Sequence, residues 1–356
     1  MRVLLLATPL DARAHLDGTR RAVIELADAL AGLGVRPLVL VRPGVLAPPS
    51  TEGVVVGEKG GAPGLLAACV RARPTIVHAL FAPRRRTGLV LAALGASLRA
   101  AIVQTIASSP PGGRGLRWPM LVGDVVVATS RWMDHALSAS GWGEDRRALV
   151  PMPFVPSMGV VADPSIPRAT LVHVGDWEDA RGIDDTLDAL VRMSPPVGVV
   201  PHLAFTARRK TGRSARKEAS VRARVEADPL LRSRVRILGE LPSLLPFLAA
   251  ARCVLLPAAT TEAKLDHPRA LLEAIALGTR LVVGGAPSLA ELVPSPSLGE
   301  VAVGAIALRE AMERAFSEPE PSPNEVLALL SPRRPEVVAA AYAQLYERAL
   351  RIRRGG

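Results

Sequence analysis

The sequence predicts an α/β protein with two domains, each built on a parallel β-sheet. Along most of the chain, short aliphatic segments of strand length alternate with longer segments whose apolar residues fall at helical spacing. This alternation is typical of parallel strands joined by crossover helices. The chain has 356 residues, too many for one ordinary domain. Hydrophobic residues make up 49% and aromatic residues only 3%, so aliphatic side chains must form the cores.

The first domain begins with an apolar segment, residues 1–7, which we interpret as a buried strand. An Ala-Arg-Ala near it weakly resembles a secretory signal, but the apolar core is too short for one. A turn at residues 17–19 precedes a helix that ends at Gly34, and residues 37–41 supply the next strand. The apolar face of that helix carries Val23, Leu26, Ala27, Leu30 and Leu33.

Three later segments of the first domain, at residues 73–78, 101–106 and 124–130, resemble strands of a known α/β family, and a helix at residues 131–140 is expected after the last of them. His78 ends the first of these strands. It could contact a ligand, although a histidine at a strand end is more often structural. Residues 108–115 predict a loop at the same edge, suited to a lid over a ligand or to a loose connection.

Five prolines between residues 150 and 167 predict a linker, and we place the boundary near Pro164. The expected domains are residues 1–160, residues 165–335 and a C-terminal helix at 336–356 that crosses back. The two halves are expected to fold separately and to close over ligand. Strands are predicted at 171–175, 202–206, 235–240 and 252–257, and helices at 183–193, 244–251 and 268–277. Residues 294–323 are rich in proline and loop-like in places.

Residues 260–293 are the most informative segment. A strand that stops at Pro257 leads into it, and from Pro268 onwards apolar residues at spacings of three and four predict a helix that Gly278 ends. Glu273 is expected on the exposed side of that helix. An acid beside the carboxyl ends of parallel strands is well placed to accept hydrogen bonds from a ribose. A solvated helix carboxylate is the alternative interpretation.

This segment, with LLEAIALGTRLVV at residues 271–283, resembles the nucleotide-sugar half of GT-B glycosyltransferases of the retaining family 4. That family has two glutamates separated by seven residues in an LLEAmA.G.pVV helix, and Glu273 matches the second. The resemblance implies two Rossmann-like domains that face a cleft, with the C-terminal helix packed back on the first domain. It implies transfer of a sugar, with retention, from a UDP- or GDP-sugar to an envelope, lipid-linked or polysaccharide acceptor, without a metal or another cofactor.

Three positions depart from the family pattern. Leu265 stands where the first glutamate is expected, and the nearest acids are Asp266 and Glu262. Asp266 lies in what we expect to be a flexible lead-in to the helix. Ala107 stands where many relatives have a histidine that contacts the donor sugar, and Asp176 stands where an arginine normally follows the glycine at Gly175. A carboxylate there would repel a diphosphate.

The resemblance also assigns cations to the donor diphosphate, on which negative charge grows as the sugar leaves. Arg181 stands in for the family's lysine. Basic residues 208–210 could compensate for Asp176, although residues 207–217 also suit a solvated basic loop. The catalytic candidates are therefore Arg181 and Asp266, and the donor-binding candidates are Gly18, Gly175, Arg181, Arg208, Glu262, Leu272 and Glu273. Gly18 matches the second glycine of the family's opening motif, where a ligand approaches the backbone closely.

The net charge is +11, and all but four of the 44 basic residues are arginine, which genome composition explains as easily as function. This charge favours anionic partners, including phosphorylated donors and a peripheral anionic membrane. Nucleic acid is not expected, because the basic groups are dispersed and aromatic residues are scarce. Cys69 and Cys253 lie in apolar runs, which fits buried thiols in a reducing compartment, so we expect the protein in the cytoplasm, with a peripheral position at the inner face of the membrane as the alternative. No run is long enough for a transmembrane helix.

A second function class remains open. A catalytically inactive binding protein with the GT-B fold would explain Leu265, Ala107 and Asp176 together. Assays of transfer and hydrolysis with a panel of UDP-, GDP- and ADP-sugars separate this alternative from the enzyme.

Overall fold

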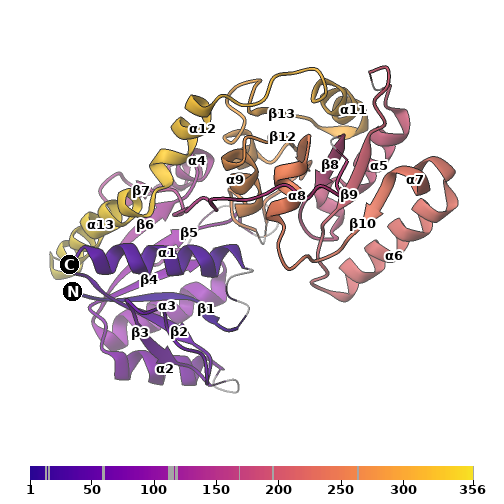
Figure 1. The fold of residues 1–356 in the computed structure, drawn as a ribbon. Helices are drawn as coiled ribbons and strands as arrows, with labels where there is room; N and C mark the ends of the chain where they lie inside the picture. The colour runs from indigo at the N-terminus through magenta and orange to yellow at the C-terminus, as the bar shows by residue number, and fades with distance from the viewer. Residues whose placement is uncertain are drawn as a thin grey trace. The chain divides into compact units, whose positions relative to one another are not determined.

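The structure, a computed structural model, describes residues 1–12, 14, 17–57, 61–110, 116, 119–167, 169–194, 196–262 and 264–355 (Figure 1). Contacts divide the chain into two compact units. Unit 1 comprises Met1–Val155, Glu262–His267 and Ser331–Gly356, and unit 2 comprises Pro156–Thr261 and Pro268–Leu330. Six residues from the middle of the second half thus belong to unit 1, which no sequence pattern indicated.

Unit 1 is built on a seven-stranded sheet of order β3-β2-β1-β4-β5-β6-β7, in which all pairings are parallel. The order reverses between β1 and β4. Its strands are β1 (Arg2–Leu10), β2 (Arg36–Val41), β3 (Glu52–Val55), β4 (Ile76–Phe81), β5 (Ala101–Ile106), β6 (Val125–Ala128) and β7 (Arg147–Leu149). Its helices are α1 (Gly18–Gly32), α2 (Gly61–Ala72), α3 (Arg85–Leu98), α4 (Arg131–Ala139), the 3₁₀ turn η4 (Ser331–Arg333) and α13 (Pro335–Gly355).

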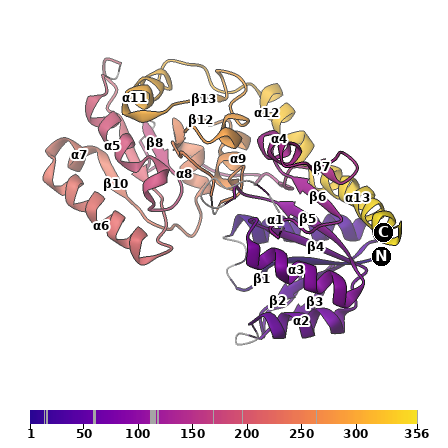
Figure 2. The ribbon, with the colours of Figure 1, turned by 180° about the vertical axis from the view of Figure 1, so that it is seen from behind.

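Helices cover both faces of this sheet, because alternate residues of each strand point to opposite sides. Val3 and Leu5 of β1 join a core with residues of α1 and α13. Leu4 and Leu6 join a second core with residues of α2 and α3 (Figures 1 and 2). The central strand β1 is therefore buried on both faces, and the predicted strand at residues 1–7 is confirmed.

The C-terminal helix α13 packs on the sheet of unit 1, as the sequence predicted. A buried polar network fixes it there. The Nδ1 atom of His78 lies 2.8 Å from the Tyr346 hydroxyl, and its Nε2 atom lies 2.8 Å from Oγ1 of Thr105. That hydroxyl is 2.9 Å from the hydroxyl of Tyr342. Both ring nitrogens of His78 are thus engaged within the core, which confirms the structural interpretation of this residue.

Burial lowers the pKa of His78 from 6.5 to about 3. Above pH 6.5 both folded and unfolded chains carry a neutral imidazole, so the full stability is present. Below pH 6.5 the unfolded chain binds a proton that the folded chain does not, and stability should fall as the pH approaches 3, by up to about 1.4 kcal/mol per pH unit. Urea denaturation of wild type and His78→Gln at several pH values measures this contribution. If the free energy of unfolding changes equally with pH in the two proteins between pH 6.5 and 4, this contribution is contradicted.

Unit 2 is built on a six-stranded parallel sheet of order β10-β9-β8-β11-β12-β13. Its strands are β8 (Thr170–His173), β9 (His202–Phe205), β10 (Val235–Ile237), β11 (Cys253–Leu256), β12 (Arg280–Val283) and β13 (Gly299–Val301). Its helices are η3 (Asp179–Arg181), α5 (Ile183–Arg192), α6 (Gly212–Ala227), α7 (Pro229–Arg234), α8 (Leu245–Ala250), α9 (Arg269–Ala276), α10 (Pro287–Ala290), α11 (Gly304–Arg314) and α12 (Pro323–Leu330). Residues of α5, α6, α7 and α11 form a core on one face.

Two predicted loops contain regular structure. Residues 207–217 are not a loop throughout, because α6 begins at Gly212 after Thr211, whose hydroxyl accepts a hydrogen bond from the amide of Ser214. Both residues complete a capping box, a start signal that the dense basic residues obscured. Within residues 294–323, β13 and α11 are present.

Both cysteines are buried, free thiols, as predicted. Burial raises the pKa of Cys69 to about 11 and that of Cys253 to about 12. These thiols therefore stay protonated at neutral pH and are poor nucleophiles.

Residues 156–167 contain no helix or strand, which suits the predicted linker. Met158 is 89% exposed and Val161 is 80% exposed. We expect limited proteolysis of the native protein to cut first between residues 155 and 165, because exposed irregular backbone enters a protease readily. Mapping the fragments by mass spectrometry tests this. First cuts within residues 171–283 would contradict the division of the chain.

Candidate functional site

The carboxyl ends of the strands in unit 2 form the candidate site. The strand order reverses between β8 and β11, and in open parallel sheets ligands bind outside the carboxyl ends at such a point. The strands nearest this reversal are β8, β9, β11 and β12, and the connections after them leave the sheet at this edge. They carry most of the residues that the sequence analysis selected.

The connection after β8 lies between the connections after β9 and β11. On one side, the amide of Arg208 donates to the carbonyl of Gly175 at 3.1 Å, and that of Trp177 donates to the carbonyl of Arg208 at 3.2 Å. On the other side, the amide of Ala259 donates to the carbonyl of Ala180 at 3.0 Å. The packing is tight, because a Cβ atom on Gly182 would lie 2.4 Å from the carbonyl oxygen of Pro257. This segment is therefore held by its backbone.

Asp176, which departs from the family pattern, is fully buried at this edge. Its Oδ1 atom accepts a hydrogen bond from Nε of Arg208 at 3.0 Å, and its Oδ2 atom lies 2.7 Å from Nζ of Lys210. The side chains of Arg208 and Lys210 are 34% and 28% exposed. One carboxylate thus holds two cations that still reach solvent. The predicted donor-binding residue Arg208 lies at this site.

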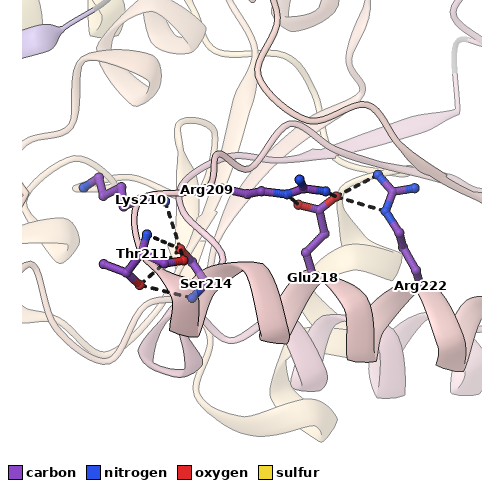
Figure 3. A network of polar contacts seen from close by, with 6 residues as sticks. All are labelled: Arg209, Lys210, Thr211, Ser214, Glu218 and Arg222. Atoms are coloured by element: carbon purple, nitrogen blue, oxygen red, sulfur yellow. Dashed lines mark hydrogen bonds and ion pairs between the residues drawn. The ribbon is translucent and has the colours of Figure 1, made fainter.

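Arg209, between these two cations, belongs to a different network (Figure 3). Its guanidinium contacts both carboxylate oxygens of Glu218 on α6, at 2.6 and 3.0 Å, and Arg222 contacts the same carboxylate. The hydrogen bond from Arg209 lowers the pKa of Glu218, although burial opposes this. This network fixes the first turns of α6, where Lys210 also donates its amide to Ser214.

Arg181, the predicted diphosphate cation, is almost entirely buried, with an exposed fraction of 1%. Its Nη1 atom donates to the carbonyl oxygen of Thr260, and its Nη2 atom lies 3.3 Å from a carboxylate oxygen of Glu178. The guanidinium therefore joins the connections after β8 and β11. Its role in leaving-group stabilisation stays a prediction.

Helix α9 begins directly after Pro268, and Gly278, with a φ of +74°, follows its end, as predicted. Glu273 is not on an exposed face, since only 4% of it is exposed, so the sequence expectation was wrong on this point. Its carboxylate accepts from the amide and hydroxyl of Ser157 at 3.3 and 3.4 Å and lies 3.3 Å from Nε of Arg269. These partners cover the acid, so it is not a solvated helix carboxylate. Ser157 was missed, because it precedes Glu273 by more than a hundred residues.

Leu272 contributes to this region through packing. Its side chain is 3% exposed, and its amide donates to the carbonyl of Pro268 at 3.3 Å. A role in donor binding stays a prediction, as does that of Gly175.

The remaining candidates, Gly18, Glu262 and Asp266, belong to unit 1. Gly18 is the first residue of α1, and the N-cap Asp17 accepts from the amides of Thr19 and Arg20 at 3.0 Å. The carboxylate of Asp17 therefore already accepts hydrogen bonds from two amides in the first turn of α1. Glu262 is partly buried.

Asp266 does not lie in a flexible lead-in, so that expectation was wrong. It is fully buried in unit 1, where its Oδ2 atom accepts from the hydroxyl of Ser130 at 2.7 Å and its amide donates to the carbonyl of Ala107 at 2.8 Å. Leu265 beside it packs against the hydrophobic core of unit 1. A glutamate at that position would place a charge against apolar side chains, which explains why leucine is found there.

Two further expectations concern loops and metals. Of the predicted loop at residues 108–115, Ser108 and Ser109 are buried, and residues 111–115 lie outside the described residues. Within the described part of the chain, no cluster of three His, Cys, Asp or Glu side chains could hold a metal ion.

Similar folds occur among solved structures. Sucrose-phosphate synthase from Thermosynechococcus elongatus aligns over 98% of this chain and 99% of its own, with a TM-score of 0.75 and 17% identity. The HepE protein of Anabaena, crystallised with UDP, aligns over 100% and 98%, with a TM-score of 0.68 and 15% identity. AviGT4, a glycosyltransferase involved in avilamycin A biosynthesis, aligns over 98% of both chains, with a TM-score of 0.68 and 20% identity. No protein-family model and no curated protein matches the sequence.

The two parallel sheets, the C-terminal helix on unit 1 and these full-length alignments lead to one structural conclusion. The chain has the GT-B fold.

Proposed function

We propose that this protein is a glycosyltransferase that moves a sugar from a nucleotide-sugar donor, with retention, to an envelope, lipid-linked or polysaccharide acceptor. The observation that carries the proposal is Glu273, a buried acid on α9 at the carboxyl edge of a parallel sheet in a GT-B fold. The UDP and UDP-glucose complexes of HepE, which has the same fold, support a UDP-sugar as donor.

The residues of unit 2 have distinct roles in this proposal. Glu273 accepts hydrogen bonds from the ribose hydroxyls in place of those from Ser157. Arg208 and Arg181 stabilise the negative charge that grows on the departing diphosphate, since preorganised cations at such a site lower the barrier to bond cleavage. Gly175 and Leu272 line the donor, and no metal or other cofactor takes part.

The residues of unit 1 serve the sugar and the acceptor. Gly18 allows close approach of a ligand to the start of α1. Asp266 or Glu262 takes over the part of the family's first glutamate. Replacing Asp266 by asparagine should then lower transfer more than nucleotide affinity. Because Ser130 donates a hydrogen bond to this carboxylate, the variant Ser130→Ala should also lower transfer.

Assays with a panel of UDP-, GDP- and ADP-sugars test the proposal. Release of a nucleoside diphosphate, by hydrolysis or by transfer to a cell-envelope extract, is the expected result with at least one donor. Turnover of none of them would favour the second candidate, an inactive GT-B-fold binding protein. Three positions favour that candidate, namely Leu265, which packs against the core of unit 1, Ala107 and the carboxylate of Asp176.

The positive net charge of +11 supports peripheral contact with anionic membrane at the inner face of the cytoplasmic membrane. Within the described residues no helix is long and apolar enough to cross a bilayer. Each basic residue near an anionic surface contributes on the order of 1 kcal/mol, which salt screens. Flotation with anionic liposomes at low salt should recover the protein, and added salt should release it. Equal recovery with neutral liposomes would contradict electrostatic binding.

A further inference from the structure

The connection after β9 carries three consecutive cations that split between two sides. Arg208 and Lys210 contact Asp176, whereas Arg209 contacts Glu218 on α6. This separation follows from extended backbone, since Arg208 forms a parallel bridge with Asp176 and successive side chains of an extended segment point to opposite sides. The alternation of side chains along this segment therefore places Arg208 and Lys210 on one side and Arg209 on the other.

Arg208 and Lys210 lie at the carboxyl edge of the sheet, beside its reversal of strand order. Asp176 follows β8 by three residues, Arg208 follows the neighbouring strand β9 by three, and the amide of Arg208 is bonded to Gly175. Two cations against one carboxylate leave a net positive charge at a position where open parallel sheets bind ligands. A multiply charged phosphate group fits this excess.

The donors of both cations also suit a phosphate. Arg208 uses Nε for Asp176, and neither terminal nitrogen of its guanidinium has a partner among the described residues. These terminal nitrogens present parallel donors of the kind that bind phosphate oxygens in pairs. The ammonium of Lys210 has three donors and forms an ion pair with Asp176. Because both side chains are about one-third exposed, a ligand can reach them without unfolding the segment.

We propose that Arg208 and Lys210 together bind the terminal phosphate of a nucleoside diphosphate, and that Asp176 is the positioning residue that aims them. This inference rests on the proposed function. The sequence predicts that this acid repels a diphosphate. Instead, it orders two flexible side chains before the ligand arrives, which lowers the entropy lost on binding. The cation that the family takes from the connection after β8 is supplied here from the connection after β9.

The variant Asp176→Asn separates the orientation of the two side chains from the net charge of the site. It raises the net charge of the site by one, so charge attraction alone predicts tighter binding of a diphosphate. If Asp176 orients the two cations, the affinity for the diphosphate should instead fall, by roughly tenfold. Arg208→Gln and Lys210→Gln should each weaken diphosphate binding by roughly ten- to hundredfold. Arg209→Gln is the matched control, because it removes the same charge from the same connection, and its affinity should stay within about twofold of wild type.

The titrants are whichever of UDP, GDP and ADP the wild type binds, and its nucleoside monophosphate. The readout is the ratio of the two affinities, because a merely structural defect lowers both affinities alike, whereas a lost phosphate contact lowers only that of the diphosphate. Thermal melting of each variant checks folding. If Asp176→Asn is unstable, the variants Arg208→Gln and Lys210→Gln still test the inference, because they replace partly exposed side chains.

Two outcomes overturn the inference while leaving the proposed function intact. The first is tighter or unchanged diphosphate binding by Asp176→Asn. The second is a ratio of diphosphate to monophosphate affinity that is the same in Arg208→Gln and Lys210→Gln as in Arg209→Gln. Absence of binding of any diphosphate by wild type overturns the proposed function itself.

Discussion

Tyr346→Ala is expected to lower the free energy of unfolding by about 3 to 5 kcal/mol, the usual cost of truncating a buried aromatic side chain. Tyr346 is fully buried between α13 and the sheet of unit 1, and its ring stacks on that of Tyr342 at 6.1 Å between centroids. Its loss also leaves Nδ1 of His78 without its partner at 2.8 Å. Urea denaturation followed by circular dichroism measures the change.

Two controls divide this cost into packing and hydrogen bonding. Tyr346→Phe keeps the ring and should cost about 1 to 3 kcal/mol, because a buried nitrogen then lacks a partner. Val337→Ala, at a position on the same helix that is 48% exposed, should change stability by no more than about 0.5 kcal/mol. An equal effect of all three variants would show that α13 is not fastened by this contact.

Glu273→Gln is expected to weaken binding of a nucleoside diphosphate roughly ten- to hundredfold, because a hydrogen bond to a charged group is worth about 1.5 to 3 kcal/mol. The substitution keeps the size of the side chain, so α9 should remain in place. Calorimetric titration of the wild type and the variant measures the change.

The control is Glu310→Gln, an acid on α11 whose side chain is 46% exposed, which should leave the affinity unchanged. Ser157→Ala adds a second comparison, since it removes the hydroxyl that bonds the carboxylate without removing the charge. It should affect nucleotide binding less than Glu273→Gln does. Unchanged affinity in Glu273→Gln would limit this acid to bonding Ser157 and Arg269.

The fold was predictable because its signals are local. Aliphatic runs of strand length, glycine after helices and apolar spacing of three and four each depend on a few neighbouring residues, as at residues 1–7 and 268–278. The start of α6 at Gly212 was missed, because a Thr211 and Ser214 capping box is weak evidence among so many basic residues. The membership of Glu262–His267 in unit 1 depends on contacts with residues distant in sequence.

The candidate site was predictable in part. Glu273 and Arg208 follow strand ends, and position after a strand is readable from the sequence. Burial is not, so the covered carboxylate of Glu273 and the enclosed guanidinium of Arg181 appear only in the folded chain. The partners of Asp176 are not readable from the sequence, which predicts a lone acid where the structure has an acid between two cations.

The most direct measurement is calorimetric titration of UDP, GDP and ADP into the intact wild-type protein. If unit 2 holds a nucleotide-sugar donor, at least one of the three binds, more tightly than its monophosphate and much more weakly to Glu273→Gln. Binding of none of them would contradict nucleotide-sugar transfer by this chain.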